Sequence, residues 1–228
     1  MKSVLLILML HLCVFVCQSL NAQSLSGSLG VGYVYIPQDP EHLEDGLLLT
    51  ASAENFFNAF FSVGFNAKFA GVSYKDDYTE FDNNKPKQET ELDISNFVYS
   101  ISFFPRFSFL RSDELILSIV PEVGLYHLLS EPTIYFTDYS NDEVTSKNYS
   151  SEKTRSIAWG VSVQGEYFLK ERLSLLICIG WNNYDLSTTI NTIDIKGDFP
   201  ESVHIDETDF LYAEIGLSYL ISGNDKRF

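Results

Sequence analysis

Hydrophobic and polar residues alternate with a period of two along the chain after about residue 24, and no stretch there shows the 3.6-residue period of an amphipathic helix. The clearest alternation runs over residues 57–70, where apolar residues occupy the odd positions. Successive side chains of a β-strand point to opposite faces, so each such segment predicts a strand with one apolar face. The predicted strands are residues 25–36, 46–54, 57–70, 96–103, 115–123, 157–169, 173–181 and 211–221.

The connections between these segments alternate between short and long. The short ones are residues 55–56, 105–113 and 170–172. The long ones are acidic, are rich in Asn, Asp, Ser and Thr, and comprise residues 37–45, 75–91, 131–154 and 188–207. An up-and-down barrel gives this pattern when every second turn lies on the same side of a membrane. We therefore predict an all-β fold, an eight-stranded antiparallel up-and-down transmembrane β-barrel with four long surface loops and short periplasmic turns.

The two faces of the predicted strands differ in composition. One is almost wholly Leu, Ile, Val, Phe, Tyr and Trp, as a lipid-facing wall requires, and the other is mainly Gly, Ser, Ala and Asn, which suit a narrow lumen. A soluble eight-stranded barrel of the lipocalin kind is the alternative, but its water-facing side should carry many charged residues. Aromatic residues also gather near the strand ends, among them Trp159, Trp181 and Tyr184 near the long loops, as in the interfacial girdles of membrane barrels.

A few charged residues lie on the small-residue face by parity. A carboxylate inside a narrow barrel must be paired, hydrated or protonated, because burying an unpaired charge is costly. We interpret this set as a structural hydrogen-bonded plug, with a polar relay or narrow cation path as the functional alternative. The predicted interior polar cluster is Glu54, Lys68, Glu122, Glu166 and Glu214.

The chain begins with Met1-Lys2-Ser3, an apolar run over residues 4–17 and a polar stretch ending at Ala22. This order is typical of a secretory signal, and the run is too short to cross a bilayer. We predict a cleavable signal peptide over residues 1–22 and an outer-membrane β-barrel over residues 23–228; the alternative is lipoprotein cleavage before Cys17. Cleavage after Ala22 leaves Cys178 as the single cysteine, so an internal disulfide is excluded.

The 228 residues carry 15 Lys+Arg against 31 Asp+Glu, a formal net charge of −16. Affinity for nucleic acid comes mainly from neutralising phosphates, so nucleic acid is excluded as a partner. With 45% hydrophobic residues the chain is too apolar to be disordered.

The signal, the eight alternating segments and the long and short connections together resemble the small outer-membrane β-barrel proteins of Gram-negative envelopes, the OmpA/OmpX-type and porin-family barrels. The resemblance covers residues 23–228 and rests on architecture, so it implies a fold and an outer-membrane location rather than an activity. Such barrels usually end on an aromatic residue inside the last strand. Here Phe228 is terminal, but a polar stretch over residues 222–227 separates it from the apolar alternation.

Catalytic chemistry has weak candidates. His127 lies at the loop end of the fifth predicted strand and Ser130 lies nearby, as the His and Ser of some barrel enzymes that modify lipids do. Side chains share a strand face at spacings of two, so these two residues point to opposite sides. His204 and Asp206 have better parity but no evident nucleophile beside them. The histidines are scattered and no EF-hand spacing appears, so we predict no catalytic site, no metal site and no cofactor.

The long loops are the remaining candidates. Residues 131–154 place tyrosines among carboxylates, and tyrosine suits recognition surfaces because it is amphipathic and costs little entropy to order. The recognition candidates are Tyr135, Tyr139 and Tyr149. We predict a non-enzymatic outer-membrane protein with a lumen filled by side chains, acting through acidic loops or within an envelope assembly. Its partners would be outer-membrane lipid and other envelope proteins or an extracellular ligand. A lipid-modifying enzyme or a narrow cation-selective channel is the alternative.

Overall fold

The computed structural model describes residues 24–37, 42–82, 85–140, 143–195, 198–199 and 203–223. The predicted signal peptide and Phe228 lie outside these residues. The strands are β1 (Ser24–Tyr35), β2 (Leu43–Phe56), β3 (Phe61–Asp82), β4 (Lys85–Arg111), β5 (Leu115–Asp138), β6 (Glu143–Asn148), β7 (Glu152–Lys170), β8 (Leu173–Asn182) and β9 (Phe210–Gly223). One short helix, α2, spans Ser187–Ile190. Among the described residues, no helix has the length and apolar character needed to cross a bilayer.

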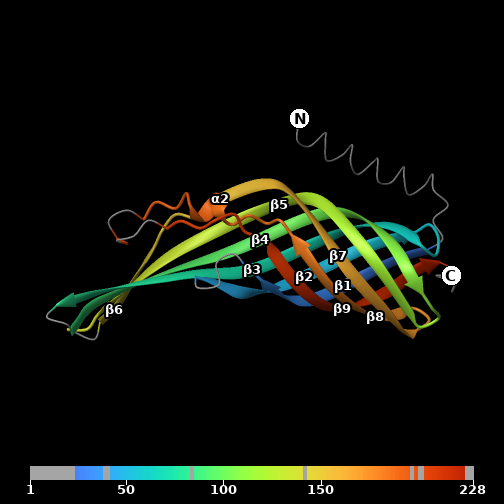
Figure 1. Cartoon of the computed structure of the whole chain (residues 1–228), viewed down its shortest axis with the longest axis horizontal. Helices are drawn as coiled ribbons and strands as arrows, with labels where there is room; N and C mark the ends of the chain where they lie inside the picture. Colours follow the sequence, from blue (N-terminus) through green and yellow to red (C-terminus); the bar gives the residue numbers. More distant parts are fainter. Residues whose placement is uncertain are drawn as a thin grey trace.

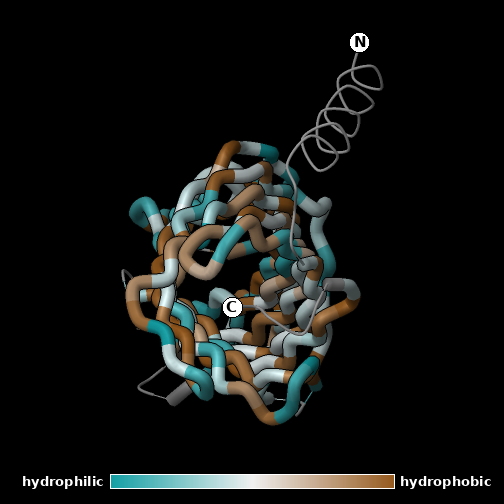
Figure 2. Tube along the Cα trace, turned by 90° about the vertical axis from the view of Figure 1, so that its right-hand side faces the viewer, coloured by the Kyte–Doolittle hydropathy of each residue, from teal (hydrophilic) through white to brown (hydrophobic). Residues whose placement is uncertain are grey.

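Eight of the strands form a closed ring in the order β1-β2-β3-β4-β5-β7-β8-β9, and every neighbouring pair is antiparallel. The ring closes where β1 pairs with β9, from Tyr35 opposite Leu211 to Ser24 opposite Gly223. Figure 2 shows this ring seen along the long axis of the molecule. The predicted eight-stranded up-and-down barrel is confirmed. β6, the ninth strand of the described part of the chain, lies outside the ring and pairs there with the far end of β5.

The short turns at residues 57–60, 112–114 and 171–172 lie at the same end of the ring as Ser24 and Gly223. Side chains hold two of them, since Asn58 Oδ1 accepts the N–H of Phe61 at 2.9 Å and Ser112 Oγ accepts the N–H of Leu115 at 3.0 Å. Short turns mark the periplasmic end of an outer-membrane barrel, so the opposite end is extracellular.

Two predicted loops are largely strand. The chain over residues 75–91 continues the β3–β4 hairpin, with paired residues up to Asp82 opposite Lys85. Residues 131–154 contain the end of β5, all of β6 and the start of β7. Figure 1 shows β3, β4, β5 and β6 extending beyond the other strands. We call this part, residues 73–82, 85–95, 131–138 and 143–148, the extracellular sheet. The predicted link over residues 105–113 is likewise mostly strand, because β4 runs to Arg111.

The outer wall of the ring is a continuous band of exposed apolar side chains, which we call the apolar belt. On β4 it runs from Phe97 to Phe107, close to the about 9–11 residues that a tilted strand needs to cross the hydrocarbon core. Its most exposed members are Leu29, Ile101, Leu125, Ile157 and Ile179. An exposed apolar surface of this extent is expected in lipid rather than in water.

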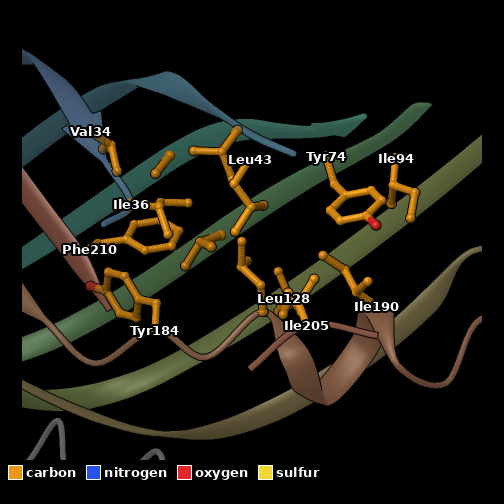
Figure 3. Close-up of a cluster of buried hydrophobic side chains, with 14 of the residues drawn as sticks. Val34, Ile36, Leu43, Tyr74, Ile94, Leu128, Tyr184, Ile190, Ile205 and Phe210 are labelled. Atoms are coloured by element: carbon orange, nitrogen blue, oxygen red, sulfur yellow. The ribbon is translucent and has the colours of Figure 1, made fainter. Parts of the chain in front are cut away.

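The cluster of buried hydrophobic residues overlaps only the upper part of this belt, where it includes Val98 and Ala158. Most of it lies at the extracellular mouth, where inward residues of the long strands meet the segment between β8 and β9. We call the described residues of this segment, 183–195, 198–199 and 203–209, the plug. Figure 3 shows Tyr184, Ile190, Ile205 and Phe210 packed together with Val34, Leu43, Ile94 and Leu128 from the surrounding strands.

Candidate functional site

The periplasmic third of the lumen is crossed by an ionic cluster centred on Arg106 of β4. Its Nη1 lies 3.1 Å from Glu54 Oε2 and its Nη2 lies 2.9 Å from Glu166 Oε2, so one guanidinium bridges two carboxylates. Its Nε donates to Ser118 Oγ at 2.9 Å. The remaining carboxylate oxygens accept hydrogen bonds from serines on neighbouring strands. Arg106 is 1% exposed, so this cluster is dehydrated and depends on its internal partners.

A second ionic cluster fills the middle of the lumen. Lys68 of β3 forms an ion pair with Glu122 of β5 and also donates to Tyr212 at 3.0 Å and to Asn182 at 3.1 Å. Asn66 Nδ2 donates to the second carboxylate oxygen of Glu122 at 2.7 Å. Four strands are therefore linked across the lumen at this level by charge-assisted hydrogen bonds.

Glu214 of β9 lies at the side of this second cluster. Its carboxylate accepts a hydrogen bond from the Thr50 hydroxyl. Gly32 lies opposite it in the register, and a Cβ there would overlap the Ala213 carbonyl oxygen, so the close approach of β1 and β9 at this point requires glycine. A cavity of about 60 Å³, lined in part by Glu214, Glu122 and Cys178, has room for a few water molecules.

The plug closes the lumen above these two clusters. Leu186 and Ile190 are fully buried at its centre. Polar side chains fix its path: Thr208 Oγ1 accepts the N–H of Leu186 at 2.8 Å, and Asn191 bonds both backbone groups of Ile205 at 2.8 and 2.9 Å. The sequence predicted a surface loop over residues 188–207, and that prediction is wrong for the buried residues of this segment.

Tyr184 is also displaced from its predicted place. It was expected in the outer aromatic girdle, but it is 2% exposed and its hydroxyl shares a hydrogen bond of 2.7 Å with Ser100 Oγ inside the barrel. Trp159 and Trp181 do lie on the outer wall near the extracellular rim, where they form an edge-on pair with ring centroids 4.5 Å apart. Such a pair is typical of the bilayer interface.

The outer face of the extracellular sheet is acidic, and we call it the acidic face. Asp77 of β3 lies directly opposite Glu91 of β4, and Glu91 lies opposite Tyr135 of β5. Lys75, opposite Asp93, forms an ion pair with Glu44 at 3.1 Å. The carboxylates of the face are Asp77, Glu89, Glu91, Asp93 and Glu131.

The three candidate tyrosines divide between two faces of this sheet. Tyr135 is exposed on the acidic face, and Tyr139 donates its hydroxyl to Glu89, which raises the pKa of Tyr139. Tyr149 instead packs against the core of the plug, with Lys147 Nζ 5.0 Å from its ring centroid. Lys147 also bridges to Asp198 of the plug at 2.5 Å, and this hydrogen bond lowers the pKa of Asp198.

His127 and Ser130 lie on opposite faces of β5. His127 faces outward with Nδ1 2.9 Å from the Thr154 carbonyl oxygen. Ser130 faces inward and donates to Asn96 Oδ1 at 2.6 Å. His204 and Asp206 are both exposed on the plug. Among the described residues, no group of three or more His, Cys, Asp or Glu side chains is placed to hold a metal ion.

The structure places the five predicted interior residues, Glu54, Lys68, Glu122, Glu166 and Glu214, inside the barrel, in two ionic clusters. The residue that sequence analysis missed is Arg106. It explains the apparent excess of interior carboxylates, because it pairs with two of them. The signal that could have found it is the run from Phe103 to Phe109, in which Arg106 has the parity of the inward positions.

No family model and no curated protein matches the sequence. Among solved structures, a major outer membrane protein from Thermus thermophilus is similar with a TM-score of 0.50 and 16% identity, over 87% of this chain and 100% of that one. Neisserial surface protein A gives 0.49 and 10%, over 87% and 98%. Ail, the attachment invasion locus protein of Yersinia pestis, gives 0.46 and 13%, over 88% and 99%. The first likeness supports the fold, and with the apolar belt around its ring the chain is a small eight-stranded β-barrel protein of the outer membrane.

Proposed function

We propose that the protein is a non-enzymatic surface receptor that binds a cationic polypeptide on the acidic face of its extracellular sheet. The observation that carries the proposal is the placement of Asp77 directly opposite Glu91 on a sheet that stands clear of the membrane. Like charges directly opposite on neighbouring strands destabilise a sheet, and Lys75, whose pKa is raised mainly by Glu44 and less by Glu91, offsets only part of this repulsion. A positively charged partner would offset the repulsion.

The surroundings of this pair suit recognition. Tyr135 is 37% exposed beside Glu91 and offers a rigid amphipathic contact. The long-range field of a chain with net charge −16 also steers cations toward it and speeds their association.

β6 adds a second kind of contact. All six of its residues are exposed, and among the described residues its one strand partner is β5. Its outward residues include Val144, which is uncharged and 64% exposed. An edge strand of this kind offers backbone donors and acceptors to an extended segment of a partner. Basic side chains of that segment would then lie beside the acidic face.

The alternatives find less support in the geometry. A channel needs a continuous hydrated path, but the described residues fill the lumen at three levels, with two ionic clusters and the plug. A lipid-modifying enzyme needs a nucleophile beside its base, whereas Ser130 and His127 point to opposite sides of the wall.

The test uses the full barrel folded in neutral detergent and a lysine decapeptide, with a glutamate decapeptide as the probe of opposite charge. We expect the lysine peptide to bind and the double substitution D77N/E91Q to weaken binding about three- to tenfold, as expected for losing two exposed ion pairs. The control D206N/E207Q removes the same charge from the exposed part of the plug. Equal weakening in both variants, or equal binding of both peptides, would contradict the proposal.

A further inference from the structure

We propose that Lys153 and Arg155 of β7, together with His127 of β5, form a binding site for the phosphate of a lipid headgroup in the outer leaflet. We call these three residues the basic rim cluster. The inference does not depend on the cationic partner proposed above, because it concerns a different part of the wall.

The register brings the three side chains together. Arg155 lies directly opposite His127, and Lys153 lies opposite Leu129. Directly opposite residues have Cβ atoms about 5 Å apart, and residues two apart on one strand share a face. Arg155 and Lys153 are exposed, and all three side chains point outward from the ring.

The cluster lies at the level of the lipid headgroups. Ile157, two residues nearer the membrane on β7, is 64% exposed, and Leu125 opposite it is 67% exposed. These two residues form the upper end of the apolar belt on this side. Arg155 is therefore the first outward position above the acyl chains. Trp159, two residues farther into the belt than Ile157, pairs with Trp181 just below this level.

The positive charge is local to this side of the rim. The corresponding positions just above the belt on other strands are Asp45 on β2, Ser73 on β3 and Ser95 on β4, which are acidic or uncharged. A general preference of long basic side chains for interfaces would spread such residues around the ring. The two long basic side chains described at this level, Lys153 and Arg155, instead share one face of β7 beside His127 of β5. The next basic residue on β3, Lys75, pairs with Glu44. This concentration of positive charge on one strand, in a chain of net charge −16, indicates a specific anionic ligand.

The chemistry fits a phosphate that is attached to acyl chains. An arginine binds phosphate oxygens in a bidentate manner, and a lysine adds a point charge beside it. His127 Nδ1–H donates to the Thr154 carbonyl oxygen, which fixes the ring. Nε2 donates to a phosphate oxygen only when the imidazole carries its second proton, so Arg155 and Lys153 are the main phosphate-binding groups. Glu131 lies on the same face of β5, two residues farther from the membrane than Leu129. Its carboxylate is therefore nearer to Lys153 than to Arg155, which lies on the membrane side of the cluster. The adjoining Ile157 and Leu125 provide the wall along which the chains of the same lipid would lie.

The test measures binding of bisphosphorylated lipid A to the full barrel in dodecyl maltoside micelles. The comparison probes are the same lipid A with its phosphates removed, and millimolar inorganic phosphate as a competitor. We expect the double substitution K153Q/R155Q to weaken binding of bisphosphorylated lipid A roughly thirtyfold, since each basic residue near an anionic surface contributes about a factor of five. The conservative variant R155K should lose part of this affinity.

The control K75Q/K87Q removes the same charge from exposed positions of the extracellular sheet and should bind as the unchanged protein does. Heat-modifiable migration on gels verifies that each variant is folded. Three results would overturn the assignment: equal binding of dephosphorylated lipid A, equal weakening in the control, or unchanged binding by K153Q/R155Q. Displacement of lipid A by inorganic phosphate would show instead a site for the free anion.

Discussion

The membrane-embedded ring and the extracellular sheet are parts of the same strands, yet their outer faces differ. The outer face of the ring is apolar and that of the sheet is polar, and the ring buries charged and polar residues beside apolar ones such as Ile116 and Val120. On β5, Ser118 and Glu122 point inward within the ring while Ile119 and Val123 face lipid. Farther along the same strand the parity is unchanged, but Leu128 and Ile134 are fully buried inside and the outward side is polar. The pleat decides which side a residue faces, and the surrounding solvent decides which side is apolar.

This difference implies that the two regions are stabilised by different forces. The extracellular core gains from the hydrophobic effect, because its alternative environment is water. The ring gains little from that effect once inserted, because lipid chains are as apolar as its side chains. Its stability therefore rests on backbone pairing and on the two ionic clusters of the lumen.

The largest expected effect is on the arginine cluster. The substitution R106M leaves Glu54 and Glu166 facing each other without a cation, and we expect a loss of about 3–5 kcal/mol in the free energy of unfolding. Urea titration in lipid vesicles, followed by gel migration, measures it. Adding E54Q and E166Q to R106M should restore most of the loss, and a loss below about 1 kcal/mol for R106M alone would show that the cluster is dispensable.

A smaller and more local effect is expected in the plug. Leu186 is fully buried, so L186A should lower the free energy of local opening by about 3 kcal/mol through the cavity it leaves. Hydrogen exchange of amides in residues 184–195 measures this opening, and the amides of β1 and β9 within the ring serve as the internal control. Equally faster hydrogen exchange in the plug and in the ring would mean that the two unfold together. It would contradict the view that they are stabilised separately.

The change of the outer face from apolar in the ring to polar in the extracellular sheet can be tested by placing a lysine on the outer face of each region. V163K places a charge on the apolar belt, where Val163 is 52% exposed, and should cost about 2–3 kcal/mol. Y135K places the same side chain on the outer face of the extracellular sheet and should change stability by at most about 0.5 kcal/mol. Vesicle unfolding titrations of both variants give the difference, and similar costs at the two positions would place Tyr135 within the membrane.

The smallest expected effect depends on pH. The hydrogen bond from Lys147 lowers the pKa of Asp198, so the folded state favours its carboxylate. A carboxyl group whose pKa is lower in the folded state than in the unfolded state stabilises the folded state at pH values above its unfolded pKa. This stabilisation is lost as the pH falls through its folded-state pKa. We expect the contact between β6 and the plug to loosen at acid pH, seen as faster hydrogen exchange in β6 after correction for the intrinsic rate. D198N should loosen the contact at neutral pH and remove the pH dependence; an unchanged dependence would assign it to another group.

The sequence was sufficient for the ring because each strand crosses the membrane with a regular apolar side. It was insufficient above the membrane for the same physical reason that makes the two regions differ. On β4, Leu92 and Ile94 have the opposite parity to Phe97 and Tyr99, so the alternation breaks phase where the solvent changes from water to lipid. A break in phase resembles the end of a strand, and the prediction therefore stopped at residue 96.

The missed parts of the site have equally physical causes. Pro105 lies where the β4–β5 ladder is interrupted between Phe103 and Phe107, and a proline usually argues against a central strand. Arg106 lies in that segment, so it is absent from the predicted interior polar cluster. The Asp, Asn and Thr residues of the plug predict a surface loop, whereas its apolar residues, including Leu186 and Ile190, are buried in the mouth of the barrel. The contacts of the plug with the barrel strands, such as Tyr184 with Ser100 of β4 and Thr189 with Ser130 of β5, join residues distant in sequence and follow no local period.

The edge-on pair of Trp159 and Trp181 has a practical consequence, because the chain contains only two tryptophans. All indole fluorescence therefore arises from a single spot where β7 meets β8 at the outer rim. An emission change during refolding into vesicles will register the moment at which this seam enters the interface. It will not report on the extracellular tips of the hairpins or on the packing of the plug into the extracellular mouth, so a separate fluorescent label is needed there.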